Sequence, residues 1–292
     1  MRLDMHVSVI VPHYNDLDGL DICLTALTRQ SFPAEHVEIL VADNASPQGQ
    51  DEVEKVVAGR ARVVTVTARG AGPARNGGAA ASRGEILAFI DSDCQADGVW
   101  LAEGINALER CDIAGGSVEV LVKDAKRMTG AEAFECVFAF NMERYVTEKG
   151  FVGSGNLFCR RRVFETVGPF GTGVSEDVDW SHRATAKGFR IGYAPHARVG
   201  HPARRNWDEL KRKWSRINAE TYGLVTRRRF GRLSWLSTFL LLPASALAHT
   251  PRVLASSHLN WRQKFMALGV LYRIRLWRML DYGRLLFGGR KV

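Results

Sequence analysis

Two aspartates, Asp91 and Asp93, follow directly on the apolar run Leu87–Ile90. Carboxylate oxygens are the ligands that hard divalent cations such as Mg²⁺ prefer, and a pair at i and i+2 can reach one cation together with the phosphate oxygens of a ligand. A simple polar turn between a strand and a loop looks the same, because a D-x-D sequence often occurs by chance. The spacing is compatible with a metal site, and the neighbouring motifs decide between this interpretation and a simple turn.

A second acidic group comes later in the chain, at Glu176, Asp177 and Asp179. A carboxylate that faces a substrate can accept the proton of an attacking hydroxyl group. Acids in the first turn of a helix also oppose its dipole, and this alternative explains one such residue easily. Three acids within four residues, beside Trp180 and Arg183, are better explained by a functional cleft.

The elements expected to position these acids alternate between strand and helix. Four apolar runs predict strands, namely Val7–Pro12, Val37–Val41, Val63–Val66 and Ile86–Ile90. Helical spacing separates the runs, and Pro73 opens an Ala-rich helix. The alternation predicts βαβ units in a parallel sheet, in which ligands bind beyond the carboxyl ends of the strands. Tyr14, Asp43 and Asp91 fall at those ends.

Five motifs follow one another along the chain: Pro12-His13-Tyr14-Asn15, Asp43-Asn44-Ala45-Ser46, the loop from Arg69 to Gly78, Asp91-Ser92-Asp93 and Glu176-Asp177-Val178-Asp179-Trp180. In order and spacing, these motifs resemble family 2 glycosyltransferases with the GT-A fold, over roughly residues 6–205. The resemblance implies an α/β fold with a mostly parallel sheet flanked by helices. It also implies an inverting enzyme that uses a nucleotide-sugar donor and a divalent metal, Mg²⁺ or Mn²⁺.

The resemblance implies roles for individual residues. Asp43 would accept the N3–H of a uracil base, Asp93 would bind the metal directly, and Asp177 would be the catalytic base. Asp91 would lie nearer the ribose or a metal-bound water, and His201 would be a late metal ligand. The implied nucleotide-sugar-binding residues are Pro12, Tyr14, Asn15, Asp43, Arg75, Asp91, Ser92 and Asn156, and the implied metal ligands are Asp91, Asp93 and His201.

Each assignment has a plainer alternative. Asp43 could only cap a turn, and Arg75 could form only surface ion pairs. His201 could be a partly buried strand histidine, and His196 competes with it for the role of metal ligand. Gly155 and Asn156 lie in a segment that resembles the donor-sugar or acceptor loop of the family. Gly155 could serve backbone geometry alone.

Beyond residue 112 the pattern predicts one strand and two helices, at Ile113–Val122, about 129–148 and Glu176–Lys187. A further helix begins after the predicted cap Asn206. We therefore expect a catalytic domain of residues 1–205 and a basic helical region of residues 206–292.

Charge divides the chain in the same way. The whole chain has 292 residues and a net charge of +9. Residues 1–200 carry 21 Lys and Arg against 27 Asp and Glu, whereas residues 201–292 carry 19 against 4. With 46% hydrophobic and 24% charged residues, the composition is that of a globular protein and excludes a disordered or collagen-like chain.

The basic region contains an uncharged run, Leu233–Ala248. At ~1.5 Å per residue it reaches only ~24 Å, short of a ~30 Å hydrocarbon core, and Pro243 interrupts it. An interfacial helix, a re-entrant helix or a helix packed on the catalytic domain all fit. If the helix lies on a membrane, we expect Trp235, Phe239 and Leu240–Leu242 to enter it.

A later segment has the amphipathic pattern of a helix that lies on an anionic membrane. Its apolar positions are Tyr272, Leu276, Met279, Leu280, Gly283 and Phe287, and its opposing arginines are Arg273, Arg275, Arg278 and Arg284. The same pattern also fits a helix packed against its own domain.

Together these features predict a cytoplasmic enzyme, peripheral on the inner face of the cytoplasmic membrane. It would transfer one sugar from a UDP-sugar to a saccharide or lipid-linked saccharide acceptor, in cell-surface polysaccharide or glycolipid synthesis. Five scattered cysteines and the lack of an apolar leader favour a reducing compartment. A nucleotidyltransferase on a similar sheet and a nucleic-acid-binding protein with a basic tail are the alternatives. No nucleic-acid-binding module is recognised, so we expect no nucleic-acid partner.

Overall fold

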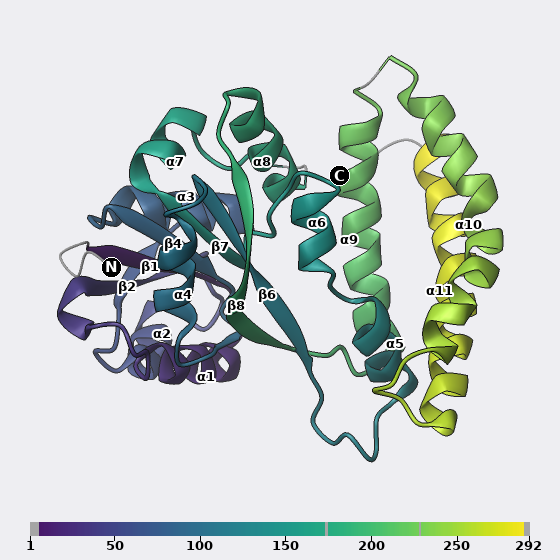
Figure 1. Ribbon diagram of the computed structural model, residues 1–292, viewed down its shortest axis with the longest axis horizontal. Helices are drawn as coiled ribbons and strands as arrows, with labels where there is room; N and C mark the ends of the chain where they lie inside the picture. The colour runs from purple at the N-terminus through teal and green to yellow at the C-terminus, as the bar shows by residue number, and fades with distance from the viewer. Residues whose placement is uncertain (1–5, 173–174, 228, 289–292) are drawn as a thin grey trace. The chain divides into compact units, whose positions relative to one another are not determined.

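The computed structural model describes residues 6–172, 175–227 and 229–288, so that the first five residues and Gly173 and Val174 lie outside the described part (Figure 1). The chain divides into two compact units. The sheet unit comprises residues 1–119, 141–172 and 176–201, and the helical unit comprises residues 120–140, 173–175 and 202–292. The main break after residue 201 lies near the predicted boundary at residue 205, but residues 120–140 also belong to the helical unit.

One half of the sheet consists of parallel strands. The eight strands of the sheet have the order β3-β2-β1-β4-β7-β6-β8-β5. Parallel pairs join β1 (Val7–His13), β2 (Val37–Asp43), β3 (Arg62–Thr65) and β4 (Ile86–Ile90). The predicted βαβ arrangement is confirmed here, because strands buried on both faces are recognisable as continuous apolar runs.

The other half of the sheet contains the antiparallel pairs. β7 (Asn156–Arg160) pairs antiparallel with both β4 and β6 (Ile113–Leu121). The short β5 (Gln95–Ala96) pairs antiparallel with β8 (Ile191–Pro202). The expectation of a parallel sheet therefore holds for residues 7–90, and the complete sheet is mixed.

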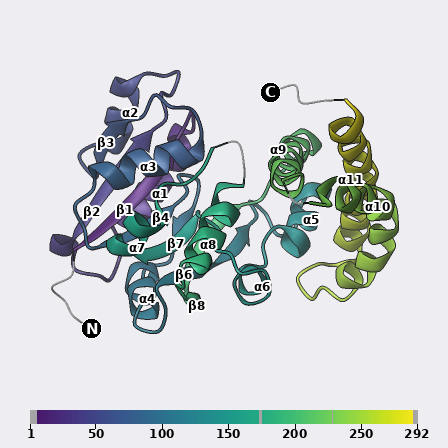
Figure 2. The ribbon, with the colours of Figure 1, turned by 90° about the horizontal axis from the view of Figure 1, so that it is seen from above.

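Helices cover both faces of the sheet and bury its side chains in two cores (Figures 1 and 2). One core joins alternate residues of β1 and β4 to α1 (Leu17–Leu27), α2 (Gln50–Val57) and α4 (Trp100–Ala107). The other joins the intervening strand residues to α3 (Ala71–Ala81), α7 (Arg161–Val167) and α8 (Glu176–Ala186). A short 3₁₀ helix, Ala34–His36, precedes β2.

The helix expected over about residues 129–148 is two helices. α5 (Gly130–Phe138) belongs to the helical unit and α6 (Met142–Thr147) to the sheet unit. The break has a local cause, because Asn141 accepts a hydrogen bond from the Arg144 amide and so caps a new helix.

The helical unit is built mainly from three long helices. These are α9 (Trp207–Val225), α10 (Gly231–Leu254) and α11 (Trp261–Phe287). Figures 1 and 2 show them side by side, with α5 against α11. Asn206 caps α9 as predicted, by accepting the Glu209 amide hydrogen at 2.9 Å. Among the described residues, no helix is both long and apolar enough to cross a membrane.

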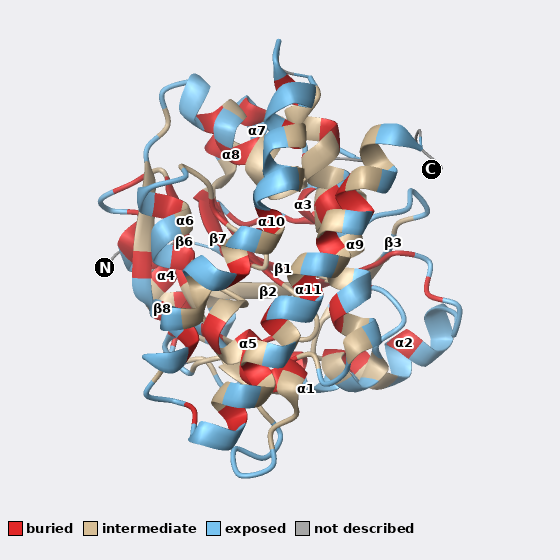
Figure 3. Ribbon diagram, turned by 90° about the vertical axis from the view of Figure 1, so that its right-hand side faces the viewer, coloured by how far each residue is buried: buried red, intermediate tan, exposed pale blue. Residues whose placement is uncertain are grey.

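Parts of α10 face the interior of the helical unit (Figure 3). Trp235 is buried and stacks on Tyr282 with ring centroids 3.7 Å apart, and Leu242 belongs to the same cluster. The expectation that Trp235 and Leu242 would enter a membrane is therefore wrong. An uncharged run gives no indication of which helix face is covered, and only Leu240 and Leu241 of that group are fully exposed.

Candidate active site

The carboxyl ends of β1, β2 and β4 lie next to one another, because β1 pairs in parallel with both other strands. This arrangement brings the segment after β1, which begins with Tyr14, to the same sheet edge as Asp43 and Asp91. Asp43 is the last residue of β2, and Asp91 comes directly after β4. The candidate site is thus formed where a parallel sheet ordinarily binds its ligand.

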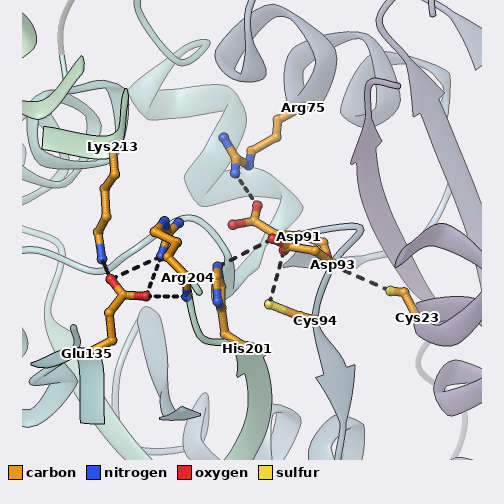
Figure 4. A network of polar contacts seen from close by, with 9 residues as sticks. All are labelled: Cys23, Arg75, Asp91, Asp93, Cys94, Glu135, His201, Arg204 and Lys213. Carbon is orange, nitrogen blue, oxygen red and sulfur yellow. Dashed lines mark hydrogen bonds and ion pairs between the residues drawn. The ribbon is translucent and has the colours of Figure 1, made fainter. Parts of the chain in front are cut away.

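Arg75 links two acidic segments that are distant in sequence. Its side chain, on α3, donates a hydrogen bond from Nη2 to Asp91 Oδ1 (Figure 4). A second bond, 3.1 Å long, runs from Nη1 to Glu176 Oε1. Burial alone would lower the pKa of the guanidinium, but Asp91, Glu176 and Asp177 together raise that pKa above its ordinary value. Arg75 is therefore a permanent interior cation, not the surface residue of the plainer alternative.

Asp93 faces His201 across the site. The His201 Nε2 atom lies 3.5 Å from Asp93 Oδ2, and the Asp93 side chain is 35% exposed. Two ligand atoms at this separation can contact one cation between them, since Mg²⁺–oxygen and metal–imidazole bonds are about 2.0–2.2 Å long. His196 is exposed on the same strand, so His201 is the histidine placed beside the acidic pair.

The three predicted metal ligands do not form one group. Within residues 6–172, 175–227 and 229–288, no three His, Cys, Asp or Glu side chains converge well enough to hold an ion. Asp91 is engaged by Arg75, whereas Asp93 and His201 remain close together. Ser92, between the two aspartates, is half-buried. Any ion held by this pair would need further oxygens from a ligand or from water.

Two thiols lie beneath the acidic pair. Cys23 Sγ donates to the Asp91 carbonyl at 3.6 Å, and Cys94 Sγ donates to Asp93 Oδ1 at 3.8 Å. Burial first, and then the charges of Asp91 and Asp93, raise the pKa of both thiols well above the ordinary value. Both cysteines are therefore neutral packing groups, because only a thiolate is a good nucleophile or metal ligand. Their contact with the acids has no signal in the sequence.

Asp43 is buried in a turn of its own. Its Oδ1 accepts a hydrogen bond from Ser46 Oγ and lies 2.9 Å from His13 Nδ1, while Oδ2 accepts the Ser46 amide hydrogen at 3.1 Å. The turn contact, the plainer alternative for Asp43, is thus present. It leaves about one of the four acceptor positions of a carboxylate unused. His13 belongs to the Pro12–Asn15 motif of the sequence, but its contact with Asp43 was not predicted.

The segment after β1 exposes an aromatic ring. Pro12 is half-buried in β1, and Tyr14 is 60% exposed at the sheet edge. Asn15 has a φ of +56°, and its amide donates to Ser46 Oγ at 3.0 Å. The left-handed residue and its hydrogen bond to the neighbouring turn hold this segment against Asp43.

Gly155 and Asn156 have different parts in the site. A Cβ atom at Gly155 would overlap Asp91 Oδ2, so the glycine allows the backbone to approach this carboxylate. The Asn156 side chain is buried, accepts from Trp100 Nε1 and donates to the carbonyls of Ser117 and Ala197. These bonds tie β7 to the neighbouring strands, and the expected donor contact of the Asn156 side chain is not favoured.

The acids of α8 are arranged around two arginines. Glu176 pairs with Arg75, and Asp179 pairs with Arg183 at 2.9 Å. Asp177 lies between them, half-buried, in the first turn of α8. Trp180, on the same helix, is buried and donates to the Gly168 carbonyl, which is a structural role.

Comparison with known proteins places these features in a family. The model of the family described as "Glycosyl transferase family 2" matches residues 8–168. Glycosyltransferase AglE of Haloferax volcanii is 34% identical over 217 residues, which cover 71% of this chain and 70% of that protein. A poly(ribitol-phosphate) beta-glucosyltransferase of Bacillus spizizenii is 33% identical over 97 residues, which cover 30% of this chain but only 15% of that protein.

A solved structure shares the fold over nearly the whole chain. The mannosyltransferase PcManGT from Pyrobaculum calidifontis, determined in complex with GDP-Man and Mn²⁺, superposes with a TM-score of 0.63 at 17% identity. The match covers 98% of this chain and 88% of that one. At this identity the likeness concerns the fold, and it supports the expected GT-A architecture.

Proposed function

Because this chain belongs to glycosyl transferase family 2, we propose that it transfers one sugar from a UDP-sugar to an acceptor hydroxyl group with inversion. Family membership makes it a glycosyltransferase, which favours this function over the nucleotidyltransferase and nucleic-acid-binding alternatives. The proposal about donor, metal and stereochemistry depends on the site itself. The observation that carries it is the pair of Asp93 and His201, 3.5 Å apart beside an Asp91 that Arg75 already holds.

In this proposal Asp93 and His201 hold a divalent cation, Mn²⁺ or Mg²⁺. Their oxygen and nitrogen atoms suit such an ion, and two protein ligands leave positions for the diphosphate oxygens of a donor. When bound, the ion stabilises the negative charge of the departing nucleoside diphosphate. Arg75 keeps Asp91 in place, so that Asp91 acts from the side of the ribose. The Mn²⁺ and GDP-Man held by PcManGT support this assignment.

The nucleoside is assigned to the segment after β1 and the end of β2. The exposed Tyr14 ring offers a face for the base, and the remaining acceptor position of Asp43 suits the N3–H of uracil. His13 and Ser46 keep the Asp43 carboxylate in one orientation. A GDP- or dTDP-sugar is the competing donor, and a donor screen separates the three.

Asp177 is proposed as the catalytic base. It would take the proton of the acceptor hydroxyl as this attacks the anomeric carbon on the side opposite the diphosphate. A single displacement of this kind inverts the anomeric centre. Its place in the first turn of α8, next to the Glu176 that Arg75 joins to Asp91, supports this role.

The proposed acceptor is a saccharide or a lipid-linked saccharide of cell-surface polysaccharide or glycolipid synthesis. Transfer of one sugar is favoured over polymerisation, because Arg204-Arg205-Asn206-Trp207 is only a loose version of the Gln-x-x-Arg-Trp motif of processive relatives. A place on the inner face of the cytoplasmic membrane fits a lipid-linked acceptor.

A donor screen with the purified full chain tests the proposed reaction. Release of UDP, GDP or dTDP from the corresponding sugars is measured with and without EDTA, and the product anomer is determined by NMR. We expect UDP release that stops in EDTA and returns with Mn²⁺ or Mg²⁺, and an inverted product. Full turnover in chelator would refute the metal assignment, and a retained anomer would refute Asp177 as the base of a single displacement.

A further inference from the structure

The outer side of α11 is apolar along its whole length. Six large apolar side chains on this side are between 38% and 77% exposed: Trp261, Phe265, Tyr272, Leu276, Leu280 and Phe287. They follow one another at intervals of four or seven residues. This spacing places them on one helical face, about 40 Å long at ~1.5 Å per residue. Gly269 lies on the same exposed side, and the exposed Arg262 and Arg273 lie beside the apolar residues.

The adjacent side of α10 continues this surface. Four leucines on it are between 40% and 66% exposed and follow one another at seven-residue intervals: Leu233, Leu240, Leu247 and Leu254. Thr250 Oγ1 lies 3.1 Å from Tyr272 Oη, and Phe239 packs against Gly283, so the two helices touch at the edges of both stripes. We call these ten exposed side chains of α10 and α11 the apolar face.

The charges around the apolar face have one sign. Residues 231–288 contain eight Lys and Arg side chains and a single acid, Asp281. Asp281 is buried and accepts from Asn218 and Arg284, so α10 and α11 expose no carboxylate. Exposed arginines lie near both ends of the face, with Arg232 at the start of α10 and Arg262 at the start of α11.

Several of the arginines predicted to oppose the apolar stripe point into the helical unit. Arg278 is buried, with its guanidinium 4.0 Å from the Trp214 ring centroid. Arg273 lies 3.9 Å from the centroid of the Trp207 ring, and burial is the main cause that lowers the pKa of Arg275 to about 10. The helix thus exposes its apolar side, while Arg278 is buried, Arg275 is half-buried, and Arg273 and Arg284 remain exposed.

We propose that the apolar face inserts into the headgroup–acyl boundary of an anionic lipid monolayer, with α10 and α11 parallel to the membrane plane. Monomeric proteins rarely expose an apolar surface of this extent without a partner. Neither helix is apolar enough to span a bilayer, and an in-plane helix requires only one apolar side. This inference depends on the proposed function only in that a lipid-linked acceptor would give such binding a purpose.

The charge pattern favours lipid over a second copy of the chain. Arginines near both ends of the face and the lack of exposed acids suit an anionic surface. In a symmetric dimer through the same face, basic ends would meet basic ends in either orientation of the helices, which is repulsive.

Vesicle sedimentation of the full chain tests the proposal without any assay of sugar transfer. The vesicles are phosphatidylcholine alone or with about one third phosphatidylglycerol, at low salt and at about 1 M salt, where the screening length falls to ~3 Å. The test variant is Leu276→Glu with Leu280→Glu. Its matched control, Ala219→Glu with Thr147→Glu, adds the same charge at exposed positions elsewhere.

We expect the wild-type chain to pellet with anionic vesicles and to remain partly bound at high salt. The leucine variant should lose about tenfold or more of its partitioning, and the control should lose no more than its added charge causes at low salt. Brominated lipids should quench the fluorescence of Trp261, and this quenching should disappear in Trp261→Phe. Binding that is unchanged in the leucine variant, or no quenching of Trp261, would overturn the proposal. So would a wild-type dimer that the leucine substitutions dissociate.

Discussion

The two units each contain a cluster of charged side chains, and the clusters differ in how far their charges are satisfied. In the helical unit, Glu135 is buried and accepts from the Arg204 amide at 2.9 Å, Arg204 Nη1 at 3.1 Å and Lys213 Nζ at 2.6 Å (Figure 4). In the sheet unit, Asp91 and Asp93 are 36% and 35% exposed, and Asp91 has one oxygen held by Arg75.

The difference separates a structural cluster from a site that can accept a ligand. Glu135, 1% exposed, has both oxygens occupied by groups of its own unit. The carboxylates of the sheet unit have partners that hold them in place and still leave about a third of each side chain exposed. Burial and ion pairing alone therefore do not identify a functional group, whereas positioned and accessible carboxylates do.

The largest expected effect concerns Asp177, in the sheet unit. Asp177→Asn keeps the shape of the side chain and removes its basicity, so turnover should fall by about 10²–10⁴-fold. The affinity for nucleotide, measured by calorimetry, should change little, because the proposed metal ligands Asp93 and His201 are intact. Turnover close to that of the wild type would transfer the role to another group, with Asp179 next to be substituted.

The next effect concerns stability and belongs to the helical unit. Glu135→Gln leaves the half-buried Arg204 and Lys213 without a counter-charge, which should destabilise the fold by about 3–5 kcal/mol in chemical denaturation. Turnover per folded molecule should be unchanged. Adding Lys213→Met should recover part of the loss. If Glu135→Gln instead lowered turnover without affecting stability, the cluster would be part of the site and the contrast between the two units would be wrong.

Arg75 should have a smaller effect on activity. Arg75→Lys keeps a positive charge but loses the fork that reaches both Asp91 and Glu176, and we expect apparent metal affinity to weaken by about 10–100-fold. A Mn²⁺ titration of turnover measures this, and saturating metal should restore much of the rate. A loss that no metal concentration restores would indicate that Arg75 contacts the donor directly.

The smallest expected effect is a pH dependence of stability. Burial alone would raise the pKa of Glu135, but Lys213 and Arg204 bring this pKa below its ordinary value. A carboxyl group with a lowered pKa in the folded state contributes stability above its unfolded pKa of about 4.3, and the contribution is lost as the pH falls through the folded value. Denaturation midpoints should therefore fall more steeply below about pH 4.3 in the wild type than in Glu135→Gln. Equal slopes would contradict this assignment.

The sequence predicted those parts of the structure that have a local cause. The strands β1 to β4 are continuous apolar runs, and the start of α9 has its cap at Asn206. The position of Asp43 and Asp91 at one sheet edge followed from parallel pairing. The antiparallel pairing of β7 with β4 and β6 has no local signal in the sequence, because strand direction depends on contacts with distant segments.

The contacts within the site were beyond sequence reasoning for the same cause. Arg75 and Glu176 are separated by 101 residues, and nothing local indicates that they form an ion pair. The side chain of Asn156 was expected at the donor but is used to join strands. On α10, an uncharged run could not show that Trp235 is covered while Leu240 is exposed.

The protonation of the two thiols beneath the acidic pair determines how readily this site reacts with oxidants. Peroxide and alkylating reagents attack the thiolate, and a raised pKa keeps Cys23 and Cys94 protonated at neutral pH. Burial, together with the charges of Asp91 and Asp93, thereby protects the sulfur atoms from sulfenic acid formation. Loss of the native arrangement would expose both cysteines and return their reactivity to that of ordinary thiols, so that chemical labelling at these positions would report unfolding of the site.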